Sequence, residues 1–283
     1  MLNRNGQNTK KMSIDTESVR NKIICVLIGS IIFTTLLIIL SPNDKKVFVS
    51  DTIEPMAAAI AAGLSILVIY RQKTDGLMGK AFTLLGAGLV LFLIAEIIWS
   101  YYTIGLKIEN PFPSIADGLW LIAYGPLFYF VFKMYRFLGA SHSKVHQLFV
   151  SCASAAFLVY LFSGISQTAD FTTQAGITSF IIAISYPILD TILLIPAALI
   201  IFNPVKGELT TVPWIFLAVL IMSIGDSTFA YSSNLPTFQN MSWIWNIFFI
   251  ASYFIVSAGL FWHNRFFIYN NKTASRSQYA ERL

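Results

Sequence analysis

Charged residues are scarce in this chain of 283 residues, at 12% of the total, while 56% are hydrophobic. A soluble globular domain usually carries about 25% charged residues, so the composition excludes a soluble globule. The chain also has no P-loop, no dinucleotide-binding glycine fingerprint and no nucleophile elbow. Nucleotide-dependent and serine-hydrolase chemistry therefore have no motif to support them.

Cysteine and histidine are equally sparse, with two and three residues. Cys25 and Cys152 both lie inside apolar runs, where we expect small buried hydrophobic side chains rather than a disulfide or a metal site. We therefore predict no metal ion, no cofactor and no catalytic cysteine or histidine.

Long apolar runs are what the sequence does contain. Runs of about 18 to 25 residues are long enough to cross a hydrocarbon core of about 30 Å as helices. The sequence predicts an all-α, polytopic membrane bundle with a membrane domain over 23–262, a basic N-terminal segment at 1–22 and a short basic tail at 263–283. The predicted spans are 23–41, 52–70, 80–102, 114–137, 146–163, 177–202, 210–232 and 241–262.

The lysines and arginines predict the orientation of these spans. With the N-terminus inside, sixteen of the 19 basic residues fall on the cytoplasmic side, and only Lys45, Lys46 and Lys107 fall outside. Short cytoplasmic loops are typically enriched in lysine and arginine. We therefore expect both termini in the cytoplasm of a multi-pass protein of the cell membrane, with the lipid bilayer as its immediate partner. The connections are too short for a nucleic-acid-binding domain, so no nucleic-acid partner is expected.

The third and fourth predicted spans resemble the seventh and eighth. EIIWSYY at 96–102 matches DSTFAYS at 226–232, and ADGLWLIAY at 116–124 matches WNIFFIASY at 245–253. Glu96 then corresponds to Asp226, and Tyr124 corresponds to Tyr253. Internal repeats are common in membrane folds. Because both copies cross the membrane in the same direction, we predict a parallel repeat of helix pairs, although chance similarity is an alternative for such short matches.

Acidic residues within the spans are the main candidates for function, because each costs about 2.5–3.5 kcal/mol near the centre of a bilayer. No lysine or arginine is predicted in the outer half of any span to pair with them. They must therefore be protonated, hydrogen-bonded, hydrated or paired with an external cation. Five tyrosines of the outer half could donate hydrogen bonds: Tyr101, Tyr124, Tyr186, Tyr231 and Tyr253. The five acidic candidates are Glu54, Glu96, Asp117, Asp190 and Asp226.

Two of these acids have an ordinary structural explanation. In Ser-Ile-Ala-Asp at 114–117, Ser114 can cap a helix while Asp117 reaches back to the Ser114 amide. Asp-Thr-Ile-Glu at 51–54 has the same spacing, so we expect Glu54 to lie in the first turn of its helix. An acid also suits the positive end of the helix dipole.

The other three acids have no capping role. Glu96 and Asp226 lie near the C-terminal ends of outward-running helices, where the helix dipole opposes negative charge. Asp190 lies near the membrane midplane, one turn after Tyr186. Tyr186 is followed directly by Pro187, which can free a backbone carbonyl. These positions favour a ligand-facing role, with buried interhelical hydrogen bonding as the alternative. The candidate ligand-binding residues are Glu96, Asp117, Tyr124, Tyr186, Asp190, Asp226 and Asn246.

Four tryptophans are predicted near the outer interface: Trp99, Trp120, Trp243 and Trp245. An interfacial belt explains such residues in most membrane proteins. The alternative is an aromatic box beside the carboxylates, which would suit an organic cation.

The segment PFPSIADGLWLIAYGPLFY at 111–129 resembles part of the multi-spanning N-terminal region of prokaryotic, often archaeal, histidine kinases and diguanylate cyclases. ISYPILD at 184–190 and the Ile-Gly-Asp at 224–226 are also similar to that region. The resemblance implies a membrane sensing module with Asp117, Tyr124, Asp190 and Asp226 at the matching positions. It departs from the pattern at Gly125, which separates Tyr124 from Pro126, and no effector domain follows the last span.

These observations favour a stand-alone sensor or signalling module with an outward-facing acidic and aromatic pocket, rather than an enzyme. We expect it to act through a separate signalling protein in the cytoplasm or the membrane. One alternative is a membrane-embedded lipid hydrolase, similar to the eight-span lysoplasmalogenases, in which paired carboxylates would activate water. A further alternative is a proton-coupled transporter of small solutes.

Overall fold

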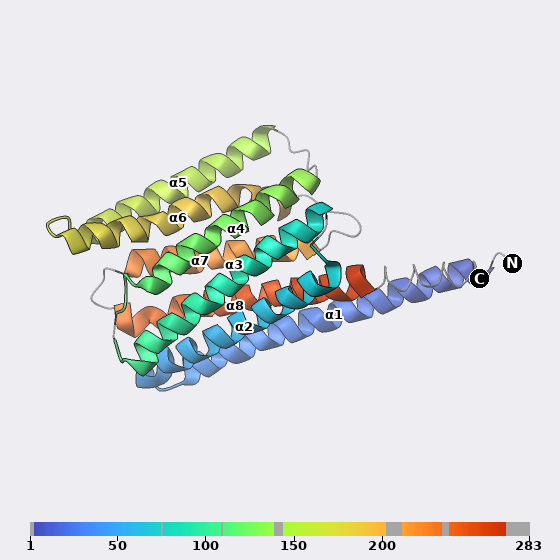
Figure 1. Ribbon diagram of the computed structural model, residues 1–283, viewed down its shortest axis with the longest axis horizontal. Coiled ribbons are helices and arrows are strands. Elements are labelled where there is room, and N and C mark those ends of the chain that lie inside the picture. Colours follow the sequence, from blue (N-terminus) through green and yellow to red (C-terminus); the bar gives the residue numbers. More distant parts are fainter. Residues whose placement is uncertain are drawn as a thin grey trace.

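The computed structural model of the chain describes residues 3–74, 76–108, 110–138, 144–201, 211–233 and 238–269. Eight long helices make up most of these residues, and no strand occurs among them (Figure 1). The helices are α1 (Asn3–Leu40), α2 (Lys46–Gln72), α3 (Gly76–Ser100), α4 (Ile115–Leu138), α5 (Lys144–Thr168), α6 (Gln174–Ile201), α7 (Thr211–Ser232) and α8 (Phe238–His263). Three short helical segments extend or join them: η1 (Asn43–Lys45), η2 (Tyr101–Gly105) and η3 (Asn264–Tyr269).

Within the described residues, all eight helices are long and apolar enough to cross a membrane, which confirms the predicted all-α, multi-pass bundle. The helix α2 begins at Lys46, six residues before the start of the predicted span at residue 52. The basic segment predicted at 1–22 is not separate from the first span, because α1 is continuous from Asn3. Of the predicted tail at 263–283, residues 270–283 lie outside the described part.

Six helices pack side by side in a closed arrangement, in the order α2, α3, α4, α6, α7, α8 and back to α2. The remaining two lie at opposite edges of the bundle, with α1 against α8 and α2, and α5 against α6 and α7 (Figure 1). The central six helices therefore form the core, while α1 and α5 present most of their length to lipid.

Small side chains allow α2 to pack closely within this ring. Ala57, Ala58, Ala61, Ala62 and Ser65 are all nearly inaccessible to solvent. Packing through small residues is the usual way for membrane helices to associate. Cys25 and Cys152, by contrast, are exposed on α1 and α5. The prediction that they are buried is wrong, because these two helices lie at the edges of the bundle.

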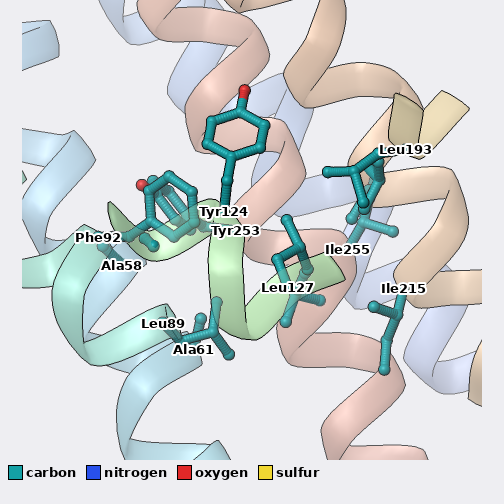
Figure 2. Close-up of a cluster of buried hydrophobic side chains, with 14 of the residues drawn as sticks. Ala58, Ala61, Leu89, Phe92, Tyr124, Leu127, Leu193, Ile215, Tyr253 and Ile255 are labelled. Carbon is teal, nitrogen blue, oxygen red and sulfur yellow. The ribbon is translucent and has the colours of Figure 1, made fainter. Parts of the chain in front are cut away.

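An apolar layer fills the middle of the ring. Leu89 and Phe92 of α3, Leu127 of α4 and Ile215 of α7 belong to this buried cluster (Figure 2). Tyr124 and Tyr253 are drawn in the same layer, and the centroid of the Phe92 ring lies 6.5 Å from that of each tyrosine ring. The tyrosine rings are therefore held by apolar packing, which leaves their hydroxyl groups to meet the polar side chains described next.

Candidate functional site

Six acidic side chains are buried inside the helix ring, towards the end that the charge distribution predicts to be outside. We call these residues the carboxyl cluster: Asp51, Glu54, Glu96, Asp117, Asp190 and Asp226, each 5% exposed or less. Among the described residues, no lysine or arginine is buried with them. Ionised carboxylates are costly to bury without a cation, so the neutralising protons or hydrogen bonds must come from within the cluster.

Glu96 on α3 receives two hydrogen bonds at the same oxygen. The Tyr253 hydroxyl on α8 donates to Glu96 Oε1 at 2.7 Å, and Trp120 Nε1 on α4 donates to it at 3.2 Å. Glu96 therefore connects three helices, although helix capping gave no reason for an acid at this position.

Glu96 also has a carboxyl neighbour. Glu54 on α2 lies beside Glu96, and both side chains line the same small cavity. Two fully ionised carboxylates offer acceptors only, and their negative charges repel each other in a buried site. A single proton shared by Glu54 and Glu96 would remove this repulsion and allow a hydrogen bond between them.

Tyr124 on α4 bridges a second carboxyl pair. Its hydroxyl lies 2.8 Å from Asp190 Oδ1 on α6 and 3.0 Å from Asp226 Oδ2 on α7. A tyrosine hydroxyl has a single hydrogen to donate, so it can donate to one carboxylate only. The second contact is favourable when the other aspartic acid is protonated and donates to the tyrosine oxygen. A single proton shared by Asp190 and Asp226 would satisfy both contacts of the Tyr124 hydroxyl.

The two carboxylate oxygens of Asp117 accept hydrogen bonds from different partners. Its Oδ2 accepts a hydrogen bond of 2.7 Å from the Ser114 amide, and Ser114 Oγ accepts one of 3.2 Å from the Ala116 amide. These bonds confirm the predicted capping of α4. The other oxygen, Oδ1, accepts a hydrogen bond of 2.9 Å from the Tyr186 hydroxyl on α6. The helix cap and the carboxyl cluster thus meet in a single residue.

The capping interpretation of Asp51 and Glu54 is wrong. Because α2 begins at Lys46, both residues lie inside the helix, past its first turn. Asp51 Oδ1 instead accepts a hydrogen bond of 2.6 Å from Asn246 Nδ2 on α8. The same Asn246 nitrogen lies 3.0 Å from Ser50 Oγ. Asp51 and Ser50 were missed as site residues because the predicted span began after them.

A small cavity of about 20 Å³ lies beside the cluster, lined by Glu54, Glu96, Asp226 and Asn246. That volume suffices for about one water molecule. Trp99, Trp120 and Trp245 line the same cavity, and the Trp99 and Trp245 side chains are buried.

The three tryptophans thus line the cavity beside the carboxyl groups, which is the arrangement expected of the aromatic-box alternative. The fourth tryptophan, Trp243, does not line the cavity, and Lys46 Nζ lies 4.7 Å from its ring centroid. Two of the five tyrosines predicted as donors, Tyr101 and Tyr231, are exposed at the bundle surface and do not belong to the cluster.

Gly225, the middle residue of the Ile-Gly-Asp sequence at 224–226, lies where α7 packs against α8. A Cβ atom at Gly225 would lie 2.7 Å from Cε1 of Phe249 on α8. The glycine lets α7 approach α8 closely, and this approach brings Asp226 to the inside of the ring.

The contacts follow the predicted repeat in a crosswise manner. Tyr253 belongs to the second helix pair and binds Glu96 of the first, while Tyr124 belongs to the first pair and binds Asp226 of the second. The helices preceding the two pairs behave alike: α2 supplies Glu54 to Glu96, and α6 supplies Asp190 to Tyr124 beside Asp226. The polar contacts of the cluster thus link the predicted pairs with each other and with the helices that precede them, α2 and α6.

The structure brings together all seven residues predicted as ligand-binding, since each is buried and bonded within the cluster or lines its cavity. Ser50 and Asp51 were missed as site residues, while Glu54, Trp120 and Tyr253 were named as candidates but not included among the predicted ligand-binding residues. No group of three or more histidine, cysteine, aspartate or glutamate side chains among the described residues is arranged to hold a metal ion. Comparison with protein families, curated proteins and solved structures found no match to this chain.

Proposed function

We propose that the protein is a sensor module of the cell membrane whose input is the uptake or loss of protons at the carboxyl cluster. The observation that carries the proposal is the presence of two buried carboxyl pairs, Glu54–Glu96 and Asp190–Asp226, with no basic residue beside them among the described residues. Each pair holds one proton in the arrangement described above. The loss of either proton leaves two facing negative charges in an apolar ring.

Charge repulsion inside the ring would act on helix packing. At about 4 Å, two unit charges interact by about 4 kcal/mol at an effective dielectric constant of about 20. This is larger than the few kcal/mol that typically separate two conformations of a protein. Because the cluster joins α2, α3, α4, α6, α7 and α8, a change at one pair is expected to shift several helices together.

The output would pass to a separate signalling protein at the predicted inner face. The helix pair α2 and α8 offers one route, because it is bonded at both ends. Asn246 meets Asp51 at the outer end, and Arg71 Nη1 donates a hydrogen bond of 3.0 Å to Asn264 Oδ1 at the inner end. Motion of α8 against α2 at the cluster is therefore expected to reach the inner surface.

The test measures helix movement directly. Cys25 and Cys152 are replaced by serine, and spin labels are placed at the exposed positions Lys73 on the inner end of α2 and Phe137 on the inner end of α4. We expect the distance distribution between the labels to differ between about pH 5 and about pH 8, and we expect Asp190→Asn with Asp226→Asn to abolish that difference.

Asp170 supplies a matched control at the same end of the bundle. It lies in the exposed loop between α5 and α6, where the hydroxyl and amide of Thr172 lower the pKa of its carboxyl group. It therefore stays ionised over the tested range. Asp170→Asn should leave the pH-dependent distance change intact. Equal loss in Asp170→Asn and in the cluster variant, or no pH-dependent change in the parent protein, would reject the proposal.

A lipid hydrolase is the second candidate, and one observation favours it. The cavity with room for about one water touches Glu54, Glu96 and Asp226, and a carboxylate beside a water can act as a general base. Incubation of the purified protein with alkenyl and acyl lysophospholipids tests this role. Hydrolysis that disappears in Glu96→Gln and Asp226→Asn, but not in Asp170→Asn, would favour the enzyme over the sensor.

A further inference from the structure

A second cavity lies away from the carboxyl cluster, on the lipid-facing side between α1, α2 and α8. Its volume is about 540 Å³, within the range of about 300–1,000 Å³ typical of small-molecule sites. Val26 and Leu27 of α1, Ile60 and Leu64 of α2, and Phe261 of α8 make most of its wall apolar. We call this cavity the α1 groove. Its lining suits a hydrocarbon chain.

Lys22 and Ser257 are polar side chains in the otherwise mostly apolar lining of the α1 groove. Lys22 lines the groove at its predicted inner end and is exposed. Ser257 on α8 also lines it and is only 7% exposed, and its hydroxyl oxygen has no hydrogen-bond partner. A buried polar group without a partner costs about 1–3 kcal/mol. An acceptor on a bound molecule would remove that cost.

Lys22 and Ser257 lie at different predicted depths along the membrane normal. Lys22 lies near the start of the first span, and Ser257 lies six residues before His263, which is about 9 Å along α8. A cation at the membrane surface and a hydroxyl donor somewhat deeper match the order of groups in a glycerophospholipid. In that lipid the phosphate is outermost, the ester carbonyls come next and the acyl chains are deepest.

We infer that the α1 groove binds one anionic glycerophospholipid of the cytoplasmic leaflet. Lys22 would attract the phosphate and the headgroup charge, the Ser257 hydroxyl would donate to an ester carbonyl, and one acyl chain would lie along Ile60 and Leu64. Basic pockets between helices on the cytoplasmic side of a membrane are known to favour anionic headgroups.

The size of the groove argues against a second copy of the chain as the occupant. One turn of an α-helix, about 5.4 Å long and 10–12 Å across, fills about 400–600 Å³. The α1 groove would therefore hold about one helical turn, whereas a spanning helix has about 20 residues. A volume of about 540 Å³ suits an acyl chain, and it cannot accommodate a helix of that length.

Native mass spectrometry of the whole purified protein tests the inference. The protein in a neutral detergent is titrated with phosphatidylglycerol or with phosphatidylcholine, and bound lipids are counted. We expect the parent protein to retain one phosphatidylglycerol more tightly than any phosphatidylcholine. Lys22→Gln should weaken phosphatidylglycerol binding about fivefold, which is the effect of about 1 kcal/mol for one basic residue near the surface. Ala258→Trp, which fills the groove from α8, should abolish the retained lipid.

Two matched controls lie on α5, the other helix at the edge of the bundle. Lys144→Gln removes a charge at the predicted inner end of α5, and Ala156→Trp adds a large side chain to its exposed face. Both should bind phosphatidylglycerol like the parent protein. If Ala258→Trp fails to fold, Leu64→Trp supplies the same obstruction from α2.

Three results would overturn the inference. One is equal loss of phosphatidylglycerol in Lys22→Gln and Lys144→Gln, which would indicate a general surface-charge effect. Another is normal lipid retention in Ala258→Trp or Leu64→Trp. The third is a dimer of the parent protein that the tryptophan variants dissociate, which would assign the groove to a second copy of the chain.

Discussion

Tyr253 on α8 donates a hydrogen bond of 2.7 Å to Glu96 on α3, and this bond has a counterpart on the other side of the ring. There, Tyr124 on α4 lies 3.0 Å from Asp226 on α7. The helix pair α3–α4 therefore supplies a tyrosine to Asp226 on α7, and the pair α7–α8 supplies one to Glu96 on α3. Neither pair can make these two contacts alone, so the carboxyl cluster helps to fix how the two halves of the bundle meet.

Removal of a crosswise hydroxyl should destabilise the bundle. Tyr253→Phe leaves Glu96 with one donor fewer in a buried site, and Tyr124→Phe removes the hydroxyl that bridges Asp190 and Asp226. Loss of a partner by a buried polar group costs about 1–3 kcal/mol, and more when that group is charged. Thermal unfolding of each variant in detergent measures the change. Tyr101→Phe, on the exposed surface, should melt like the parent protein. Equal melting of all three variants would refute the structural role of the crosswise bonds.

The contact between Asp51 and Asn246 permits a charge-exchange test. Asn246→Asp places a second carboxyl group against Asp51, at a position where the amide nitrogen now lies 2.6 Å from Asp51 Oδ1. We expect destabilisation at neutral pH and partial recovery on acidification, because a protonated carboxyl group can donate the lost hydrogen bond. Adding Asp51→Asn to Asn246→Asp should restore stability. If the double variant is no more stable than Asn246→Asp alone, the pair does not interact as described.

The two roles of Asp117 can be separated by variants of its partners. Ser114→Ala removes the serine hydroxyl that caps α4, and loss of such a cap costs about 1 kcal/mol. Tyr186→Phe leaves the cap intact and removes the donor to Asp117 Oδ1. We expect both variants to lower the unfolding temperature but only Tyr186→Phe to change the pH-dependent label distances. If instead only Ser114→Ala changed the pH-dependent label distances, Asp117 would act on the cluster through the cap of α4 and not through Tyr186.

The close contact at Gly225 should tolerate little added volume. A methyl group at Gly225 would overlap the Phe249 ring and push α7 away from α8. Overpacking of this kind typically costs about 1–3 kcal/mol. Gly225→Ala is therefore expected to unfold at a lower temperature than Gly118→Ala, whose site on α4 has no atom within 4 Å of the added Cβ. Combining Gly225→Ala with Phe249→Ala should recover part of the loss.

The sequence was sufficient to predict the eight spans, because membrane helices are encoded by local hydrophobicity and length. The cap of α4 was also predictable, since Ser114 and Asp117 lie three residues apart and contact each other directly. The role of Asp51 was not predictable, because it depends on where α2 begins and on Asn246, which is 195 positions away in the chain.

The tryptophans show a second limit of sequence reasoning. Trp99, Trp120 and Trp245 lie at the depth expected of an interfacial belt, and depth is what the sequence predicts. Which way each ring faces is set by the rotation of its helix against its neighbours, and rotation depends on long-range packing. The hydrogen bond from Trp120 to Glu96 could therefore be identified only from the packed bundle.

The central claim is that each carboxyl pair, Glu54–Glu96 and Asp190–Asp226, shares one proton. Infrared difference spectroscopy measures this directly, because a protonated carboxyl group has a carbonyl stretching band that a carboxylate lacks. At neutral pH we expect two such bands in the parent protein. Glu54→Gln should remove one, Asp190→Asn should remove the other, and Asp170→Asn should change neither. Absence of protonated carboxyl bands at neutral pH, or bands that persist unchanged in both cluster variants, would contradict the account.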